Sequence, residues 1–172
     1  MADDRDALVA AWTDPEIRRW TAVPDDADQA CASRWIAGGD QRRDDGLALD
    51  LVATATDDGR ILGEVGLWAF DRRRRAARIG WWTAAPERGR GVAATMVRML
   101  TDWAHDGPLG LHAVVAEVDR ANLASVAVVR AVGFDLLGRD PEHVGPEAAP
   151  GPALLVFASL RTASGRGAPA RV

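Results

Sequence analysis

The spacing of hydrophobic and polar positions changes several times along the chain, and each change predicts a structural element. In the first forty residues, helical spacing and capping residues predict three helices, over residues 4–12, from Pro15, and over residues 24–36. Asp14 is placed to cap the second helix, and Asp25 or Asp26 lies near the start of the third. Gly38-Gly39 is expected to stop the third helix.

Strand-forming residues replace this helical spacing in the middle of the chain. Three strands are predicted, over residues 47–52, 61–70 and 77–83. Asp57-Asp58-Gly59 marks the first turn between them, and the charged residues 71–75 form the second. Because short turns join strands in antiparallel fashion, we expect a three-stranded meander.

Helices and strands then alternate through the second half. The predicted elements are helices over 91–105 and 122–132, and strands over 111–118, 134–137 and 153–160. Asn122 is placed to cap the second of these helices, and Gly133 to end it in the left-handed conformation. The pattern predicts one α+β domain over residues 1–160, with a proline-rich loop over 141–152 and a disordered tail over 161–172.

Composition excludes several classes of protein. The 172 residues contain no apolar run of the ~20 residues that a membrane span needs, and the acidic start is no signal peptide, so we expect a cytoplasmic protein. A net charge of −4 argues against a nucleic-acid partner, and one cysteine with three scattered histidines gives no metal site. The chain has neither lysine nor tyrosine, so neither residue can serve as a base or an acid.

The strongest local motif lies between a predicted strand and a predicted long helix, and it reads Arg88-Gly89-Arg90-Gly91-Val92-Ala93. Small residues let the backbone approach a ligand closely, and free amides at a helix N-terminus attract an anion. The two arginines add charge that suits a pyrophosphate. The alternative is a glycine-rich surface turn with two solvated arginines.

Two other phosphate-binding motifs fit this segment poorly. A P-loop is excluded because it requires a lysine. Residues 89–94 satisfy the dinucleotide pattern Gly-x-Gly-x-x-Ala, with Glu117 further on, but residues 84–88 separate them from the preceding strand. The preceding meander also differs from the βαβ unit that a nicotinamide cofactor requires.

Further blocks on both sides of this motif carry a family resemblance. They read Leu-Gly-Glu-Val-Gly-Leu at 62–67, Ala-Arg-Ile-Gly-Trp-Trp at 77–82, Asn122-x-x-Ser125, and Val-Gly-Phe at 132–134. With Arg88, Gly91 and Ala93 in the pattern Gln/Arg-x-x-Gly-x-Gly/Ala, the chain resembles the GNAT superfamily of N-acetyltransferases. Within that superfamily it is similar to the branch that includes the ribosomal-protein N-terminal acetyltransferases, and the resemblance covers most of residues 15–160.

The resemblance implies a GNAT fold, which is a mixed and mostly antiparallel sheet flanked by helices. Its fourth and fifth strands splay apart, and acetyl-CoA binds between them as co-substrate. No metal is implied. The pantetheine arm of acetyl-CoA would run along Trp82, Thr83 and Ala84, near Asn122 and Ser125. The residues implied to hold the pyrophosphate are Arg88, Gly89, Arg90, Gly91, Val92 and Ala93.

Catalysis in this family implies direct attack of an amine on the thioester, with a base for the amine and an acid for the thiolate. The family's tyrosine acid is replaced by Val129, so Ser125 is the expected acid. Glu64, Glu142 and His143 are the candidate bases, and each of them can equally be a solvated surface group. The branch favours a protein or peptide N-terminus as acceptor, and a small-molecule amine is the other class. A GNAT module that binds an acyl-CoA or a partner without catalysis is the alternative function.

Two further features shape expectations. The strand that usually precedes the family's first helix is missing, which would expose a sheet edge and favours a homodimer. Trp81 and Trp82 are adjacent and therefore face opposite sides of the sheet, so that one can shape the acceptor cleft. The other five tryptophans are expected in the core: Trp12, Trp20, Trp35, Trp68 and Trp103.

Overall fold

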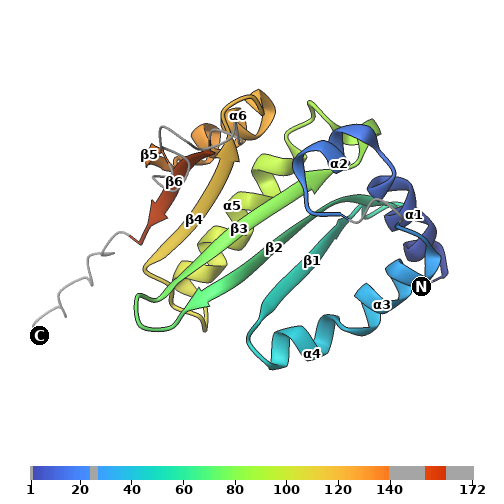
Figure 1. The fold of residues 1–172 in the computed structure, drawn as a ribbon, viewed down its shortest axis with the longest axis horizontal. Helices are drawn as coiled ribbons and strands as arrows, with labels where there is room; N and C mark the ends of the chain where they lie inside the picture. Colours follow the sequence, from blue (N-terminus) through green and yellow to red (C-terminus); the bar gives the residue numbers. More distant parts are fainter. Residues whose placement is uncertain (1, 24–26, 140–153, 162–172) are drawn as a thin grey trace, which may run out of the picture.

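The computed structural model describes residues 2–23, 27–139 and 154–161. Its helices flank a single sheet (Figure 1). The helices are α1 (Ala2–Trp12), α2 (Pro15–Trp20), α3 (Gln29–Ala37), α4 (Gly39–Asp44), the 3-10 turn η1 (Ala85–Glu87), α5 (Val92–Asp106) and α6 (Leu123–Val132). The strands are β1 (Ala48–Thr54), β2 (Ile61–Asp71), β3 (Ala76–Thr83), β4 (Ala113–Asp119), β5 (Asp135–Arg139) and β6 (Leu154–Leu160).

The six strands form one sheet in the order β1-β2-β3-β4-β6-β5. β1, β2 and β3 pair antiparallel, which confirms the predicted meander. β6 pairs antiparallel with both β4 and β5, so the pairing of β3 with β4 is the only parallel one among the described strands. The sheet is therefore mixed and mostly antiparallel, as the resemblance implies.

β3 and β4 separate after a short paired segment. Their register holds over three positions, from Ala76 opposite Ala113 to Arg78 opposite Val115. β3 continues to Thr83 and β4 to Asp119 without further pairing between them. Counted with the family's usual first strand, β3 and β4 are the fourth and fifth strands, which the resemblance predicts to splay apart. The gap between them faces the start of α5 and of α6.

Hydrophobic residues pack in two clusters, one on each face of the sheet. The larger cluster joins the inner residues of β2, β3 and β4 to α5 and α6, and its fully buried members include Leu67, Val97 and Val114. The smaller cluster joins α1, α2 and α3 to Trp82 of β3. Trp81 packs against the larger cluster, so the expectation that the two adjacent tryptophans face opposite sides is confirmed.

Two details of the N-terminal helices differ from the sequence predictions. α3 begins at Gln29, and its cap is Asp28, whose carboxylate accepts a hydrogen bond from the Cys31 amide at 2.7 Å; residues 24–26 lie outside the described part. Gly38 ends α3 but keeps right-handed dihedrals, so the chain enters α4 at once instead of stopping. A Cβ at Gly38 would lie 2.8 Å from the Arg42 guanidinium and 3.2 Å from the Arg34 carbonyl oxygen.

Two of the expected core tryptophans are exposed. Trp68 is 41% and Trp103 is 42% exposed; each lines a cavity and belongs to neither cluster. Trp12 is buried, while Trp20 and Trp35 are half-buried. Helical or strand spacing identifies the face of an element, but it does not reveal whether another element covers that face.

The sheet edge formed by β1 has no neighbouring strand in the part of the chain that the structure describes. The described residues before Ala48 contain helices and turns and no strand. A homodimer that pairs through this edge remains a prediction. No described helix is both long enough and apolar enough to cross a membrane.

The packing of β2 gives a stability test with a matched control on β1. Leu67 is fully buried in the larger cluster, whereas Leu51 is 43% exposed. We expect Leu67→Ala to lower the free energy of unfolding by about 2–5 kcal/mol and Leu51→Ala by less than about 1 kcal/mol. Chemical denaturation of both variants measures this, and equal losses would contradict the assignment of the core.

Candidate active site

Two cavities meet where β3 and β4 separate. One, of about 600 Å³, lies on the side of Glu64 and is called the acceptor cavity here; the other, of about 490 Å³, lies on the side of the loop after β3 and is called the loop cavity. Both are lined by Trp20, Thr21, Trp81, Trp82, Asn122 and Ser125. The site is therefore one continuous cleft with two chemically different halves.

The loop cavity ends at an anion-binding geometry. Gly89 and Gly91 adopt left-handed dihedrals, with φ of +74° and +80°, which turn the backbone sharply into α5. Gly91 caps α5 without any side-chain hydrogen bond, whereas side chains cap α2, α3 and α6. The first amides of α5, at Val92, Ala93 and beyond, are thus left for a ligand, and the dipole of this 15-residue helix favours a negative one.

Both arginines of this loop already hold carboxylate partners. Arg88 makes an ion pair with Asp14, the cap of α2, at 2.7 Å, and donates to the Thr83 carbonyl at 3.3 Å. Burial opposes the charge on Asp14, but hydrogen bonds from Arg88 and from the Ile17 and Glu16 amides outweigh it and lower the pKa of this carboxyl. Arg88 thereby ties the loop to the helix that leads into the acceptor cavity.

Glu87 holds the second arginine of the loop, Arg90, by an ion pair. Its carboxylate is buried and pairs with Arg90 at 2.9 Å and with Arg60 at 3.3 Å. The sequence predicted Asp14 as a helix cap, which the structure confirms, but neither its ion pair with Arg88 nor the role of Glu87 was predicted. Together these carboxylates fix the orientation of the loop.

Asn122 and Ser125 lie at the junction of the two cavities, where α6 begins. The Asn122 side chain accepts a hydrogen bond from the Ser125 amide at 3.0 Å, which confirms the predicted cap. Both side chains line both cavities, and the Ser125 hydroxyl has no hydrogen-bond partner among the described residues. Val129, the position of the family's tyrosine, is fully buried in the larger cluster and cannot supply an acid.

The backbone of β3 presents alternate residues to the cleft. The Ala84 amide donates to the Leu62 carbonyl at 2.9 Å, so this end of Ala84 points toward β2. Alternation then turns the backbone groups of Trp81 and Thr83 toward the open side. Of the three residues expected along the pantetheine arm, Thr83 has a free amide on that side, while Trp82 and Ala84 face β2.

Glu64 is the candidate base that the structure places in the acceptor cavity. It lies on β2 opposite Trp82, whose indole nitrogen donates a hydrogen bond to the Glu64 carboxylate. Burial raises the pKa of Glu64 to about 7, the Trp82 hydrogen bond opposes the rise, and the Asp50 charge adds to it. Glu64 can therefore take up or release a proton near neutral pH.

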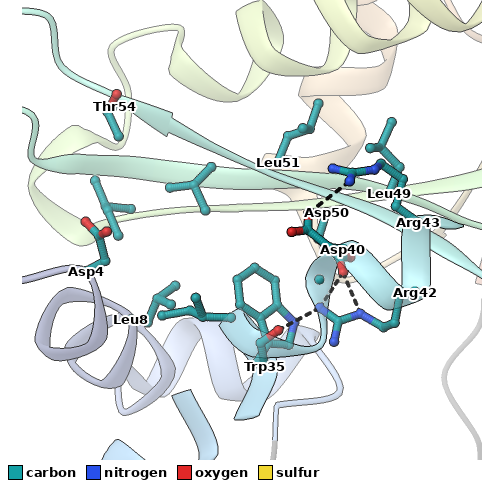
Figure 2. Close-up of a pocket in the computed structure, with 14 residues that line it drawn as sticks. Asp4, Leu8, Trp35, Asp40, Arg42, Arg43, Leu49, Asp50, Leu51 and Thr54 are labelled. Atoms are coloured by element: carbon teal, nitrogen blue, oxygen red, sulfur yellow. Dashed lines mark hydrogen bonds and ion pairs between the residues drawn. The ribbon is translucent and has the colours of Figure 1, made fainter. Parts of the chain in front are cut away.

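Asp50 and Arg42 form an ion pair whose charges act on Glu64. Figure 2 shows this pair from the side of the N-terminal helices. Two guanidinium nitrogens of Arg42 lie 2.8 and 2.9 Å from one Asp50 carboxylate oxygen, and a further bond of 3.0 Å joins Arg42 to the Trp35 carbonyl. Asp50 raises the pKa of Glu64 and Arg42 lowers it, so the two charges of the pair act in opposite directions. Asp50 also borders a separate cavity of about 310 Å³ between β1 and the N-terminal helices.

The remaining candidates fall in different places. Arg78 pairs with Glu117 across the splayed strands at 2.9 Å, at the edge of the acceptor cavity. Glu142 and His143 lie outside the described residues, so their relation to the cleft stays a prediction. Within the described ranges, no group of three or more His, Cys, Asp or Glu side chains is arranged to hold a metal ion.

The chain is similar to known proteins in sequence and in fold. A family model described as "Acetyltransferase (GNAT) domain" matches residues 1–135. The chain is 25% identical over 138 residues, 79% of its length and 76% of the relative's, to "Uncharacterized N-acetyltransferase p20" of Bacillus licheniformis.

Solved structures share the fold at lower identity. Ribosomal-protein-S5-alanine acetyltransferase from Vibrio fischeri superimposes with a TM-score of 0.78 at 17% identity, covering 93% of this chain and 87% of that one. Microcin C7 self immunity acetyltransferase MccE, in complex with acetyl-CoA and AMP, gives 0.78 at 18% identity, covering 93% and 88%.

The raised pKa of Glu64 predicts how stability depends on pH. Between the unfolded value of 4.5 and the folded value of about 7, the folded state binds more protons than the unfolded state. The free energy of unfolding should therefore fall as pH rises through this window, by up to about 3 kcal/mol. We expect Glu64→Gln to flatten this slope in denaturation series from about pH 5 to about pH 8.

The exposed carboxylate of Asp102 on α5 gives a control, because Asp102→Asn also removes one negative charge. This variant should keep the slope of the unmodified protein. The same slope in all three proteins would show that Glu64 titrates normally.

Proposed function

Because the chain belongs to the GNAT family of acetyltransferases and is an N-acetyltransferase, we propose that it moves the acetyl group of acetyl-CoA to a primary amine by direct attack. The observation that carries this proposal is the continuous cleft, with an uncapped helix N-terminus at one end and a carboxyl group of pKa about 7 at the other. Each half suits one of the two substrates.

The loop cavity suits the co-substrate. The amides from Gly89 to Ala93, including the first turn of α5, would hold the pyrophosphate by hydrogen bonds and the helix dipole. The open backbone of β3 would pair with the pantetheine arm through Trp81 and Thr83. Arg88 and Arg90 would act at the same site, held in place by Asp14 and Glu87.

Glu64 in the acceptor cavity and Ser125 at the junction of the two cavities would transfer the protons of the reaction. Bound acetyl-CoA supplies an activated acyl group whose carbon–sulfur bond breaks when the amine attacks its carbonyl carbon. An amide on the open side of β3 would polarise the carbonyl oxygen. Glu64 would accept the proton that the ammonium group loses, directly or through water. After the attack the nitrogen loses a second proton, which Ser125 would relay to the departing thiolate, so that its own hydroxyl is restored.

The acceptor we favour is the N-terminal amine of a protein or peptide, with a small-molecule amine as the other class. The name of the structurally similar ribosomal-protein-S5-alanine acetyltransferase supports the first. The acceptor cavity holds the Glu64 carboxyl, with a pKa of about 7, which suits a primary amine of either class.

Two variants should separate binding from catalysis. Gly91→Glu places a side chain at φ +80° and a negative charge at the start of α5, so calorimetry should show acetyl-CoA affinity reduced at least about tenfold. Glu64→Gln should keep that affinity and lose about 10²–10⁴ in amine-dependent thiol release. The unmodified protein should lose activity below a pH of about 7, where Glu64 is protonated.

Gly59→Glu is the matched control for the binding variant. Gly59 has φ +74° and open space around a Cβ, as Gly91 has, but it lies in the hairpin turn between β1 and β2. Its variant should bind acetyl-CoA normally. Failure of the unmodified protein to bind acetyl-CoA would overturn the proposed function.

A further inference from the structure

Tryptophan is concentrated around the acceptor cavity. The chain has seven tryptophans, and six of them line this one cavity: Trp12, Trp20, Trp35, Trp68, Trp81 and Trp82. The seventh, Trp103, borders a different cavity at the far end of α5. Proton transfer does not require a wall of aromatic side chains. We therefore relate these tryptophans to the part of the acceptor that lies next to its amine.

Part of this aromatic wall is fixed and part is free to contact a ligand. Trp12 and Trp82 are buried, and Trp12 packs edge-on against Trp35 with ring centroids 5.8 Å apart. Trp20, Trp35 and Trp81 are only half-buried, and Trp68 is 41% exposed. Guanidinium groups lie over two of these rings, Arg19 over Trp20 and Arg42 over Trp35, so Trp68 and Trp81 are the rings that offer surface to a flat apolar group.

Gly80 fixes Trp68 against the sheet. A Cβ at Gly80 would lie 2.7 Å from Cη2 of the Trp68 ring, so the ring rests directly on the backbone of β3. Trp68 thus stands as a flat, pre-oriented surface beside the ion pair of Arg78 and Glu117. A large aromatic side chain held in one orientation gives contact area at little cost in entropy.

The cavity leaves few carboxylates for a positively charged acceptor. Four carboxylates line it, but Asp50 is paired with Arg42 and Glu117 with Arg78. Among the described residues, Glu64 and Asp119 are the cavity carboxylates without a guanidinium partner. A polyamine, with several positive charges, would require more unpaired carboxylates than this cavity offers.

We propose that the acceptor is a primary amine joined through a short link to an aromatic ring, with the amine at Glu64 and the ring against Trp68 and its neighbours. This inference rests on the proposed function and specifies its substrate. Two sources share the chemistry, a free arylalkylamine and the aromatic N-terminal residue of a peptide. The cavity volume of about 600 Å³ is within the range that encloses a small ligand.

Amine-dependent thiol release with matched acceptors tests this proposal. We expect kcat/KM for 2-phenylethylamine to exceed that for butylamine at least about tenfold, since the ring adds apolar burial and aromatic contact. Spermidine should be no better than butylamine. The peptides Phe-Ala-Ala and Ala-Ala-Ala extend the comparison, and a larger gain for Phe-Ala-Ala than for 2-phenylethylamine would identify the peptide as the source.

Two tryptophan variants show whether the wall is responsible. Trp68→Leu should raise KM for the better aromatic acceptor about tenfold and leave butylamine nearly unchanged. Trp103→Leu removes a tryptophan of similar exposure away from the cavity and should change neither acceptor.

The outcomes separate this inference from the proposed function. Equal use of aromatic and aliphatic amines, or a preference for spermidine, would overturn the inference while leaving the acetyltransferase activity established. If calorimetry shows no acetyl-CoA binding, or if no amine in the panel releases thiol, the proposed function and this inference fail together.

Discussion

The early separation of β3 from β4 is the constraint on which the site depends. Parallel pairing stops after Arg78 and Val115, and the strands that continue beyond this point leave one side of β3 without a partner. Unpaired backbone in a cleft is costly unless a ligand or water satisfies it. The gap also lets α5 and α6 point their N-termini at the same space, which brings an anion site, Asn122 and Ser125 together.

Around this gap, charged side chains act chiefly by holding other groups in place. Asp14 and Glu87 hold the two loop arginines, while Arg42 compensates Asp50 beside Glu64. Glu64 has no such cationic partner, and this explains why burial dominates its pKa. A carboxyl left partly neutral beside a paired one is suited to general acid–base chemistry.

Local signals were sufficient to predict much of this molecule. The turns of the meander, the Asn122 cap, the left-handed Gly133 and the Gly89-Arg90-Gly91 loop each depend on a few adjacent residues, and the structure contains all of them. Other features depend on what another element contributes. The ion pairs of Arg88 with Asp14 and of Arg78 with Glu117, the burial of Glu64 and the exposure of Trp68 could not be read from spacing. The start of α3 was misplaced because several aspartates there can each cap a helix, and only packing selects Asp28.

Amide exchange along β3, measured by nuclear magnetic resonance with and without acetyl-CoA, tests most directly whether the splayed strand receives the co-substrate. We expect exchange of the Trp81 and Thr83 amides to slow when acetyl-CoA saturates the protein, because these amides face the open side. The Ala84 amide, which is already bonded to the Leu62 carbonyl, serves as the internal reference and should change little. Unchanged exchange at Trp81 and Thr83 in the saturated protein would contradict the placement of acetyl-CoA between β3 and β4.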